Sequence, residues 1–400
     1  MMFSKKVSKS KENENELICM QFMTKICALA GLFPGNSNTN INKIYVIVLT
    51  TASIVGWIYS VYIKNNFMLT GCNVFIKITD QISCGLLCLA TVTFSLTSTF
   101  VYPGKFFNAI QSLKRFDYLI NISSPRTVSM GLAIFIFGNA VLLFPMVLDT
   151  LAWINRYDLN TYKCYFIRNF QYYQLGVITF LWLWFALEIR KRFVLFNKFL
   201  IKMIPTPSIL LRNDAHHHGL FKMANIPQIR DEIKHKTALY NGLCDIVDLI
   251  NDVFGAGLLI YVIFTISYVL LYSIILIEYT VFDSKTRIDN YIIITSIVWI
   301  IGDFVKMMVV ALAGETLSSE SFKTVRICYG IINSLENGPN QYYDGIKQEL
   351  NFLIQQATHR KPCLTASGFF VANSTMMGFI IGSITSYVIV AVQFLNEMSN

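Results

Sequence analysis

Long apolar runs without a charged side chain recur along the chain. Four of them hold between 18 and 25 residues and lie at 44–63, 128–148, 170–187 and 253–277. A hydrocarbon core about 30 Å thick requires roughly 20 helical residues, so each run is long enough to cross a bilayer. The pattern therefore predicts membrane-spanning helices and not a water-soluble domain.

Three further stretches complete the predicted set. In 74–101 and 290–313, one Lys and one Asp stand three residues apart, so they share a helix face and partly neutralise each other. The last stretch, 364–396, has 33 residues without Asp, Glu, Lys or Arg. We therefore predict an all-α membrane protein with seven transmembrane helices, at 44–63, 74–101, 128–154, 169–189, 253–282, 290–313 and 364–395.

Composition and charge agree with this class and orient the chain. The 400 residues are 54% hydrophobic and 14% charged, whereas soluble proteins average roughly 25% charged residues. With the N-terminus in the cytoplasm, the inner segments carry 25 Lys and Arg residues and the outer loops carry 6. This bias predicts a cytoplasmic N-terminus and an extracellular C-terminus. The net charge of +9 reflects the same excess of Lys and Arg on the inner side. Because no nucleic-acid-binding motif accompanies it, the charge does not predict nucleic-acid binding.

The segments between the spans divide the predicted chain into parts. Residues 1–43 form a cytoplasmic N-terminal tail with a short helix at about 17–30. Residues 44–313 contain the first six spans. Their longest inner connection, at about 205–227, is rich in Pro, Asn and His, which predicts a flexible loop.

Helical patterns continue beyond several spans on the predicted cytoplasmic side. Residues 188–203 and 229–252 extend the fourth and fifth spans, and the anchor segment 314–363 contains an extension at 315–335 and an amphipathic helix at 342–358. Each extension is apolar on one side and must pack against protein. The partner is either the same bundle or another subunit, and periodicity does not distinguish these alternatives.

The last span contains an amide and is longer than a membrane requires. Gln393 lies near its end, where an amide is costly in lipid, so this residue is a candidate for a pore wall. As one helix the 33 residues would reach roughly 50 Å. Because Gly368, Gly378 and Gly382 offer points for a break, we predict that 364–396 divides into a cytoplasmic half, about 364–375, and a pore half, about 377–396.

The sequence shows no phosphate-binding loop, metal-ligand spacing or nucleophile motif, so it predicts neither an enzyme nor a bound cofactor or metal. The tract His216–His218 lies in the predicted flexible loop without cysteine partners and is interpreted as solvated linker. Cys72 and Cys164 fall in predicted outer loops, where they form either a disulfide or two free thiols.

Three short segments carry a resemblance to a known family. Residues 386–394, Ser-Tyr-Val-Ile-Val-Ala-Val-Gln-Phe, resemble the closing signature of insect gustatory receptors, which is Thr-Tyr, five apolar residues and Gln-Phe. Residues 251–255, Asn-Asp-Val-Phe-Gly, resemble the family segment that leads into the fifth helix, and 365–370 resemble the start of its last helix. The chain thus resembles an insect gustatory receptor, of the seven-span chemoreceptor superfamily shared with insect odorant receptors.

The resemblance implies a ligand-gated, non-selective cation channel in the plasma membrane of sensory neurons. It implies a homotetramer, or a heterotetramer with other gustatory receptor subunits, in which the last helix of each subunit lines a central pore. A pocket for a small-molecule tastant would lie in the helical bundle of each subunit, and cytoplasmic helices would form an anchor domain where subunits meet. The expected partners are the tastant, cations and membrane lipid.

The pore residues follow from helical spacing on the last span. Stepping back from Gln393 by three or four residues places Ile389, then Ser386 or Thr385, and then Gly382 on the same stripe, with Phe394 beside Gln393. We predict a ring of Gln393 amides, a hydrated vestibule at Ser386, and a gate at Ile389 and Phe394 that excludes water. The alternative for Gln393 is a hydrogen bond between helices. Glu397 is either a charge at the outer mouth or a solvated tail residue.

Aromatic and polar residues in the outer halves of the spans give a candidate ligand pocket. We select Asp149, Tyr173, Tyr272 and Trp299, since rings combined with a few polar groups suit small-molecule recognition. The alternative for each is the aromatic belt at the membrane interface. Abundant apolar lining favours non-sugar, aversive compounds over sugars.

Two other classes are alternatives. A G-protein-coupled receptor also has seven spans, but that class has its N-terminus outside, and this chain lacks the Asp/Glu-Arg-Tyr and Asn-Pro-x-x-Tyr segments. A secondary transporter would use Lys77, Asp80, Asp303 and Lys306 for a coupled ion, although structural pairing explains these charges equally well.

Overall fold

The computed structural model describes residues 25–32, 40–68, 74–120, 127–156, 162, 165–203, 219–278, 290–336 and 343–399. In this part of the chain, seven helices are long and apolar enough to cross a membrane. They are α2 (Asn40–Ile63, continued by the π-helix Lys64–Met68), α3 (Val74–Leu96, continued by the π-helix Thr97–Val101), α5 (Thr127–Arg156), α7 (Tyr165–Met203), α9 (Gly219–Ile277), α10 (Asn290–Glu336) and α12 (Ser374–Ser399). The remaining elements are α4 (Lys105–Leu119), α11 (Asp344–His359), β1 (Thr365–Ala366) and β2 (Phe370–Val371). Each predicted span therefore corresponds to one helix.

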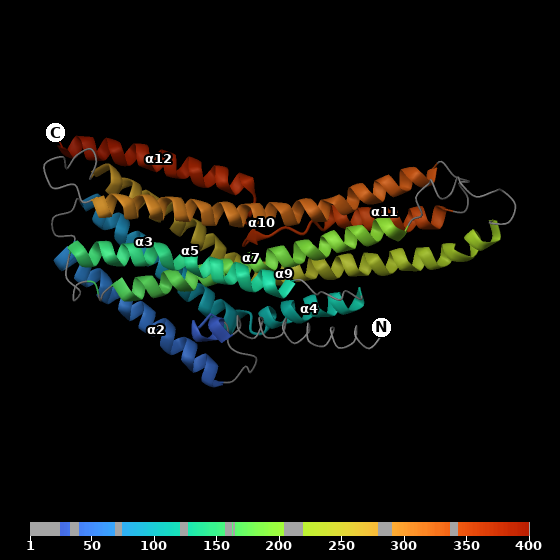
Figure 1. Cartoon of the computed structure of the whole chain (residues 1–400), viewed down its shortest axis with the longest axis horizontal. Coiled ribbons are helices and arrows are strands. Elements are labelled where there is room, and N and C mark those ends of the chain that lie inside the picture. The colour runs from blue at the N-terminus through green and yellow to red at the C-terminus, as the bar shows by residue number, and fades with distance from the viewer. Residues whose placement is uncertain are drawn as a thin grey trace.

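The helices form one elongated bundle with two halves (Figure 1). We call the half that contains α2, α3, α5 and α12 the spanning half. The other, the extension half, contains α4, α11 and the continuations of α7, α9 and α10, which run through both halves. The helical extensions predicted from periodicity are therefore present, whereas α4 was not predicted.

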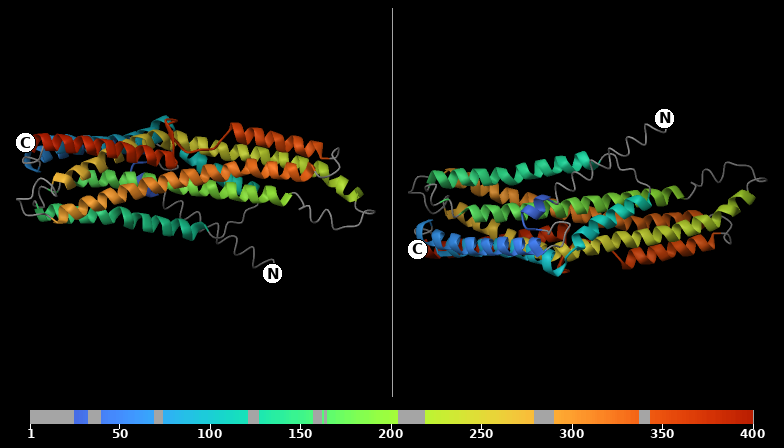
Figure 2. Two further views of the ribbon diagram at one scale, coloured as in Figure 1. Left: turned by 90° about the horizontal axis from the view of Figure 1, so that it is seen from above. Right: turned by 90° about the horizontal axis from the view of Figure 1, so that it is seen from below.

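Helix α9 lies at the centre of the bundle. It packs against α3, α4, α7, α10, α11 and α12, and one continuous apolar core surrounds it. Phe185 and Phe193 of α7 and Tyr240 and Phe254 of α9 are fully buried in that core. By contrast, α12 runs along an outer edge of the bundle (Figures 1 and 2). Contacts with six other helices along its length stabilise α9 well beyond the length of one span.

The predicted cytoplasmic half of the last helix is wrong. Residues 365–371 form an antiparallel hairpin in which Thr365 pairs with Val371. Three residues, 367–369, connect the strands, and the backbone nitrogen of Phe369 donates to the carbonyl of Ala366 at 3.0 Å. Ser367 and Gly368 have φ angles of 51° and 78°, positive values that are uncommon outside turns. The helix starts only at Ser374 and is unbroken to Ser399, which at about 1.5 Å per residue suits a single membrane crossing.

Other boundaries differ more modestly. Helix α9 already begins at Gly219, so the last part of the loop predicted at 205–227 is helical. The tract His216–His218 lies outside the described residues, as do Cys72 and Cys164. Most of the predicted N-terminal tail, 1–24, also lies outside them, and residues 25–29 are helical.

Candidate functional site

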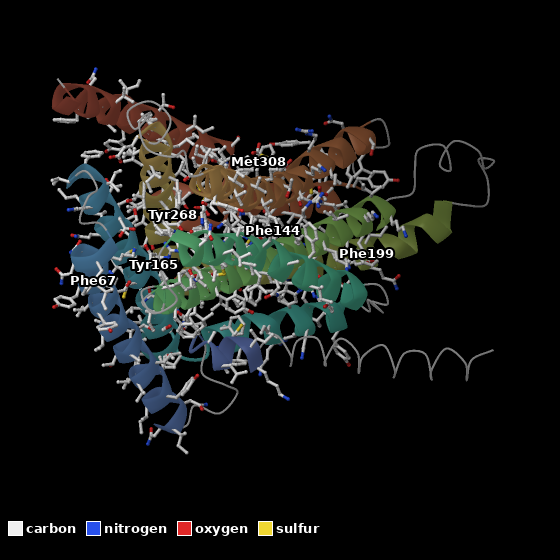
Figure 3. All side chains as sticks on the ribbon, turned by 60° about the vertical axis from the view of Figure 1, so that its left-hand side comes forward. Phe67, Phe144, Tyr165, Phe199, Tyr268 and Met308 are labelled. Carbon is white, nitrogen blue, oxygen red and sulfur yellow. The ribbon has the colours of Figure 1, made fainter. Side chains whose placement is uncertain are left out.

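A cluster of charged and aromatic side chains is buried inside the spanning half. We call it the polar cluster; its charged members are Lys64, Asp80, Asp149 and Arg168. It lies where the end of α2, the start of α3, the end of α5 and the start of α7 meet. Figure 3 shows Tyr165 and Tyr268 of this region in the spanning half, away from Phe199 in the extension half. Because burial of an ion is costly, each charge here requires a partner.

The carboxylate of Asp149 is neutralised by one cation and accepts hydrogen bonds from two indole groups. It forms an ion pair with Arg168 of α7, and its side chain is fully buried. The indole Nε1 groups of Trp153 and Trp299 donate to its Oδ1 at 3.0 and 3.3 Å. Three donors from three helices therefore satisfy the carboxylate, which is the condition under which a buried ion is tolerated.

Lys64 forms the second buried ion pair. Its Nζ lies 3.0 and 2.8 Å from the two carboxylate oxygens of Asp80. The predicted pairing of Asp80 with Lys77 is therefore wrong, because the π-helical end of α2 brings Lys64 inside. The ring of Tyr165 lies 4.8 Å from Lys64 Nζ and 4.3 Å from Arg168 Cζ, so one aromatic ring contacts both cations.

Aromatic rings from α7, α9 and α10 adjoin these charges. The ring centre of Trp299 lies 4.6 Å from that of Tyr172 and 5.5 Å from that of Tyr268. The hydroxyl oxygens of Tyr268 and Tyr272 are 3.2 Å apart. The edge-to-face contacts of Trp299 with Tyr172 and Tyr268 favour close ring packing. Tyr172 also donates to Asp303 at 2.6 Å, and Asp303 forms the ion pair with Lys306 that the spacing predicted.

The structure brings together three of the four predicted pocket residues. Asp149, Tyr272 and Trp299 belong to the polar cluster, and all three are buried, so they do not form a lipid-facing belt. Tyr173 lies apart, since its hydroxyl donates to Asn139 of α5 at 2.9 Å. Sequence reasoning did not select Lys64 or Arg168, because both stood at span ends that read as outer loops.

A small cavity lies between α3, α7, α9 and α10. It leaves room for about one water molecule. Its lining is mainly apolar, with two hydroxyl groups, and consists of Phe94, Ile178, Thr179, Trp182, Phe254, Leu258, Tyr261 and Val310. The rings of the polar cluster are in direct contact with one another, so this conformation is closely packed around them.

Helix α12 carries the predicted pore residues on its exposed face, beside exposed apolar residues such as Phe379 and Tyr387. Ser386, Ile389 and Gln393 are exposed, while the opposite face buries Met376, Ile380, Ile384 and Ala391. Ser386 donates to the carbonyl of Gly382 in its own helix at 2.9 Å. Within the described chain, the side-chain amide of Gln393 makes no hydrogen bond, so an interhelical bond inside one subunit does not account for it.

Phe394 occupies a different position from Gln393. Its ring stacks against that of Phe75 at the start of α3, with centres 6.3 Å apart and an interplanar angle of 23°. About half of the residue remains exposed, at 52%. Phe394 therefore fixes the end of α12 to α3 in addition to bordering the exposed stripe.

Comparisons with known proteins cover nearly the whole chain. A family model described as 7tm Chemosensory receptor matches residues 21–395. The solved structure of the insect olfactory receptor OR5 from Machilis hrabei has a similar fold, with a TM-score of 0.57, 12% identity, and coverage of 94% of this chain and 97% of that one. The same receptor in complex with eugenol gives a TM-score of 0.55 with the same identity and coverage. A search of curated protein sequences gave no match.

Proposed function

The chain belongs to the 7tm chemosensory receptor family of insects, and from this premise we propose that it is a gustatory receptor that acts as a ligand-gated, non-selective cation channel. In this proposal four subunits, identical or mixed, surround a pore lined by α12. The N-terminus is cytoplasmic and the C-terminus extracellular, which agrees with the distribution of Lys and Arg. The receptor would act in the plasma membrane of sensory neurons.

The chemistry of the exposed face of α12 is the observation that carries this proposal. Ser386 and Gln393 lie on the surface of a membrane-spanning helix, away from the packed core of the subunit. The hydroxyl of Ser386 already donates to the carbonyl of Gly382, but the amide of Gln393 requires water or another subunit, because hydrocarbon provides no hydrogen-bond partner. A shared aqueous pore supplies the water, and Gln393 would then present one amide per subunit to hydrated cations.

The polar cluster is the proposed tastant site. It combines aromatic rings with buried hydrogen-bonding groups, the mixture by which proteins recognise small molecules. The receptor of similar fold was solved with eugenol, which supports a small-molecule ligand here. Asp149, Tyr272 and Trp299 would contact or border the ligand, and Tyr173 would contribute from the side facing α5. A closely packed, largely aromatic site favours non-sugar compounds.

Whole-cell recording tests the channel proposal. The chain is expressed in cells without its native partners, and current is measured while a panel of sugars and bitter compounds is applied. Ligand-evoked current that survives G-protein blockade supports a channel and excludes the G-protein-coupled alternative. Failure of every compound to evoke current in a receptor present at the cell surface would contradict a homomeric channel, and co-expression with other gustatory receptor subunits would then test a heteromer.

Substitution of Gln393 tests the pore assignment. Gln393→Glu should raise the permeability of divalent relative to monovalent cations, because it adds a ring of negative charges. Ile381→Ala is the matched control, since Ile381 is also exposed but lies roughly 120° around the helix. Equal permeability ratios in the Gln393→Glu variant and the wild type would remove Gln393 from the conduction path.

A further inference from the structure

The hairpin between α11 and α12 is held by one side chain of the central helix. The amide nitrogen of Asn251 in α9 donates to the carbonyl of Cys363 at 2.9 Å. The backbone nitrogen of Thr365 donates to the amide oxygen of Asn251, also at 2.9 Å. A side-chain amide has one donor and one acceptor side, so Asn251 bonds this strand as the backbone of a neighbouring strand would.

Two helix glycines let the hairpin lie directly on the helices. A Cβ atom at Gly255, one turn beyond Asn251, would lie 2.9 Å from the backbone nitrogen of Ser367. At Gly314 of α10 it would lie 2.2 Å from the carbonyl oxygen of Ala372. Both contacts are with backbone, so a side chain there would displace the hairpin. The hairpin residues Ala366 and Ala372 are fully buried as a result.

One end of the hairpin is tied to α9 and the other end to α10. Before it, Arg360 donates to Asp245 and Asp248 of α9 at 2.6 and 2.5 Å. After it, the backbone nitrogen of Ser374, the first residue of α12, donates to Glu315 of α10 at 3.1 Å. The bonds to Asp248 and Asp245 raise the pKa of Arg360, so the guanidinium stays charged. The N-terminal end of α12 is therefore attached to α9 and α10.

Along the rest of α12, hydrogen bonds to other helices give way to apolar packing. Thr385 and Ser386 donate to carbonyls within α12 itself, and Phe394 contacts α3 through its ring. Helix α9, in contrast, carries both Asn251 and the polar-cluster residues Tyr268 and Tyr272. Seventeen residues separate Asn251 from Tyr268, roughly 25 Å along one continuous helix. A displacement of α9 at the polar cluster therefore reaches the hairpin directly.

We infer that Asn251 is a positioning residue for gating: its amide couples the segment 361–373, which contains the hairpin, to α9. It thereby sets the position of α12 relative to the helices that surround the polar cluster. This inference rests on the proposed function, in which α12 lines the pore. Displacement of α9 or α10 by a ligand would move the hairpin with it, and α12 would follow because it begins at Ser374 without an intervening linker. Without the amide, α9 can move without displacing the hairpin and α12.

The first test removes the Asn251 amide and measures two consequences, the ligand-evoked current and the accessibility of α12 to a thiol reagent. Asn251→Ala should lower the ratio of ligand-evoked to resting current about tenfold, a typical size for coupling between sites. It should also change the rate at which a water-soluble thiol reagent modifies Ser386→Cys, followed by mass spectrometry of that peptide in purified receptor. The matched control is Asp252→Ala. Asp252 is the next residue on α9, but it pairs with Lys105 of α4 at 2.6 Å, so both readouts should stay at the wild-type value.

The second test replaces the hydrogen bonds by a covalent bridge. In a Cys363→Ser background, the double variant Asn251→Cys and Thr365→Cys should behave like Asn251→Ala while its thiols are free. A short bis-methanethiosulfonate linker, applied to receptor already at the cell surface, forms a disulfide with each Cys and releases methanesulfinate. It should restore the current ratio, and a reductant that cleaves the two disulfides should abolish the restoration. A role in folding alone does not give such a rescue, because the receptor has already folded when the bridge forms.

The outcomes separate this inference from the proposed function. An unchanged thiol-modification rate in Asn251→Ala together with an unchanged current ratio would overturn the positioning role, even in a receptor that conducts. Absence of rescue by the bridge would also overturn it. If the wild type carries no ligand-evoked current in any subunit combination, the channel proposal fails. The modification rate of Ser386→Cys then still decides whether Asn251 positions α12.

Discussion

Helices α2 and α12 have the same mean hydropathy and the same small buried fraction, but they arrange their polar residues in opposite ways. Helix α2 buries Thr50, Ser53 and Ser60 and exposes an aliphatic and aromatic face that includes Ile44, Ile47, Val48, Val55, Ile58 and Tyr62. Helix α12 buries aliphatic residues and exposes Ser386 and Gln393 beside apolar residues such as Phe379, Ile381 and Tyr387. The exposed face of α2 suits lipid, whereas the exposed amide of Gln393 is the feature of α12 for which we propose contact with water or a neighbouring subunit.

Their ends differ as well, although both contact α3. The end of α2 is fixed by the buried ion pair between Lys64 and Asp80. The end of α12 is fixed by the ring stack of Phe394 on Phe75. The first contact is expensive to break and the second is weak. We therefore expect the C-terminal end of α12 to be easier to displace than the end of α2.

The largest expected effect comes from breaking the ion pair at the end of α2. Asp80→Ala leaves Lys64 charged and buried without its partner, which should destabilise the receptor by about 3–5 kcal/mol. The measurement is the fraction of monodisperse receptor that survives heating in detergent. The double variant Lys64→Met and Asp80→Leu removes both charges and should recover most of that loss. Equal stability of Asp80→Ala and the wild type would contradict the pairing.

The next effect contrasts the exposed faces directly. Val55→Lys on α2 places a charge against lipid and should cost about 2.5–3.5 kcal/mol of insertion, seen as lower surface expression. Ser386→Lys on α12 should keep normal surface expression and instead reduce cation current, because it adds positive charge to the proposed pore. If both variants lost surface expression equally, the two faces would share one environment, and the comparison would fail.

A smaller effect is expected at the end of α12. Phe394→Ala removes the stack on Phe75, worth about 1 kcal/mol, and should leave the receptor folded. The freed helix end should raise the resting current without ligand. Phe75→Ala removes the same contact from the other side and serves as the matched variant. Absence of leak in both variants at normal surface expression would count against a gating role for this stack.

The smallest effect concerns the hydroxyl groups on α12. Ser386→Ala should change thermal stability by no more than about 0.5 kcal/mol, since this hydroxyl bonds only a carbonyl of its own helix. Its single-channel conductance should shift slightly, because a polar wall group is lost. A loss of stability comparable to that of Val55→Lys would show that Ser386 packs against another protein surface and not against water.

Much of the fold was predictable because apolar length and charge-free runs determine where a chain crosses a membrane. The seven spans and the long extensions of α7, α9 and α10 follow from that pattern. Helix α4 was missed, because it is short and its pattern stands between two spans. The hairpin at 365–371 was read as helix, since its charge-free composition matches both and only the turn residues Ser367 and Gly368 distinguish them.

The site was predicted less well, for a physical reason. Asp149, Tyr272 and Trp299 were selected because aromatic and acidic residues stand out in apolar spans, and they do come together. Their ionic partners were not identified, since Lys64 and Arg168 stand at helix ends where sequence cannot tell a solvated charge from a buried one. Tyr173 follows Tyr172 in sequence but faces α5, a direction that depends on how α7 is rotated.

The sequence by itself determined the class of this protein: seven apolar helices and three short segments that identify an insect chemoreceptor. These features are local, because the length of an apolar run and the spacing of a motif do not depend on neighbours. Only the tertiary structure decided which charges pair, which face of α12 is left open, and that Asn251 of α9 holds the hairpin before α12. The ion pairs join neighbouring helices across 16 and 19 positions, and the bonds of Asn251 span more than a hundred, so both arise only when helices pack.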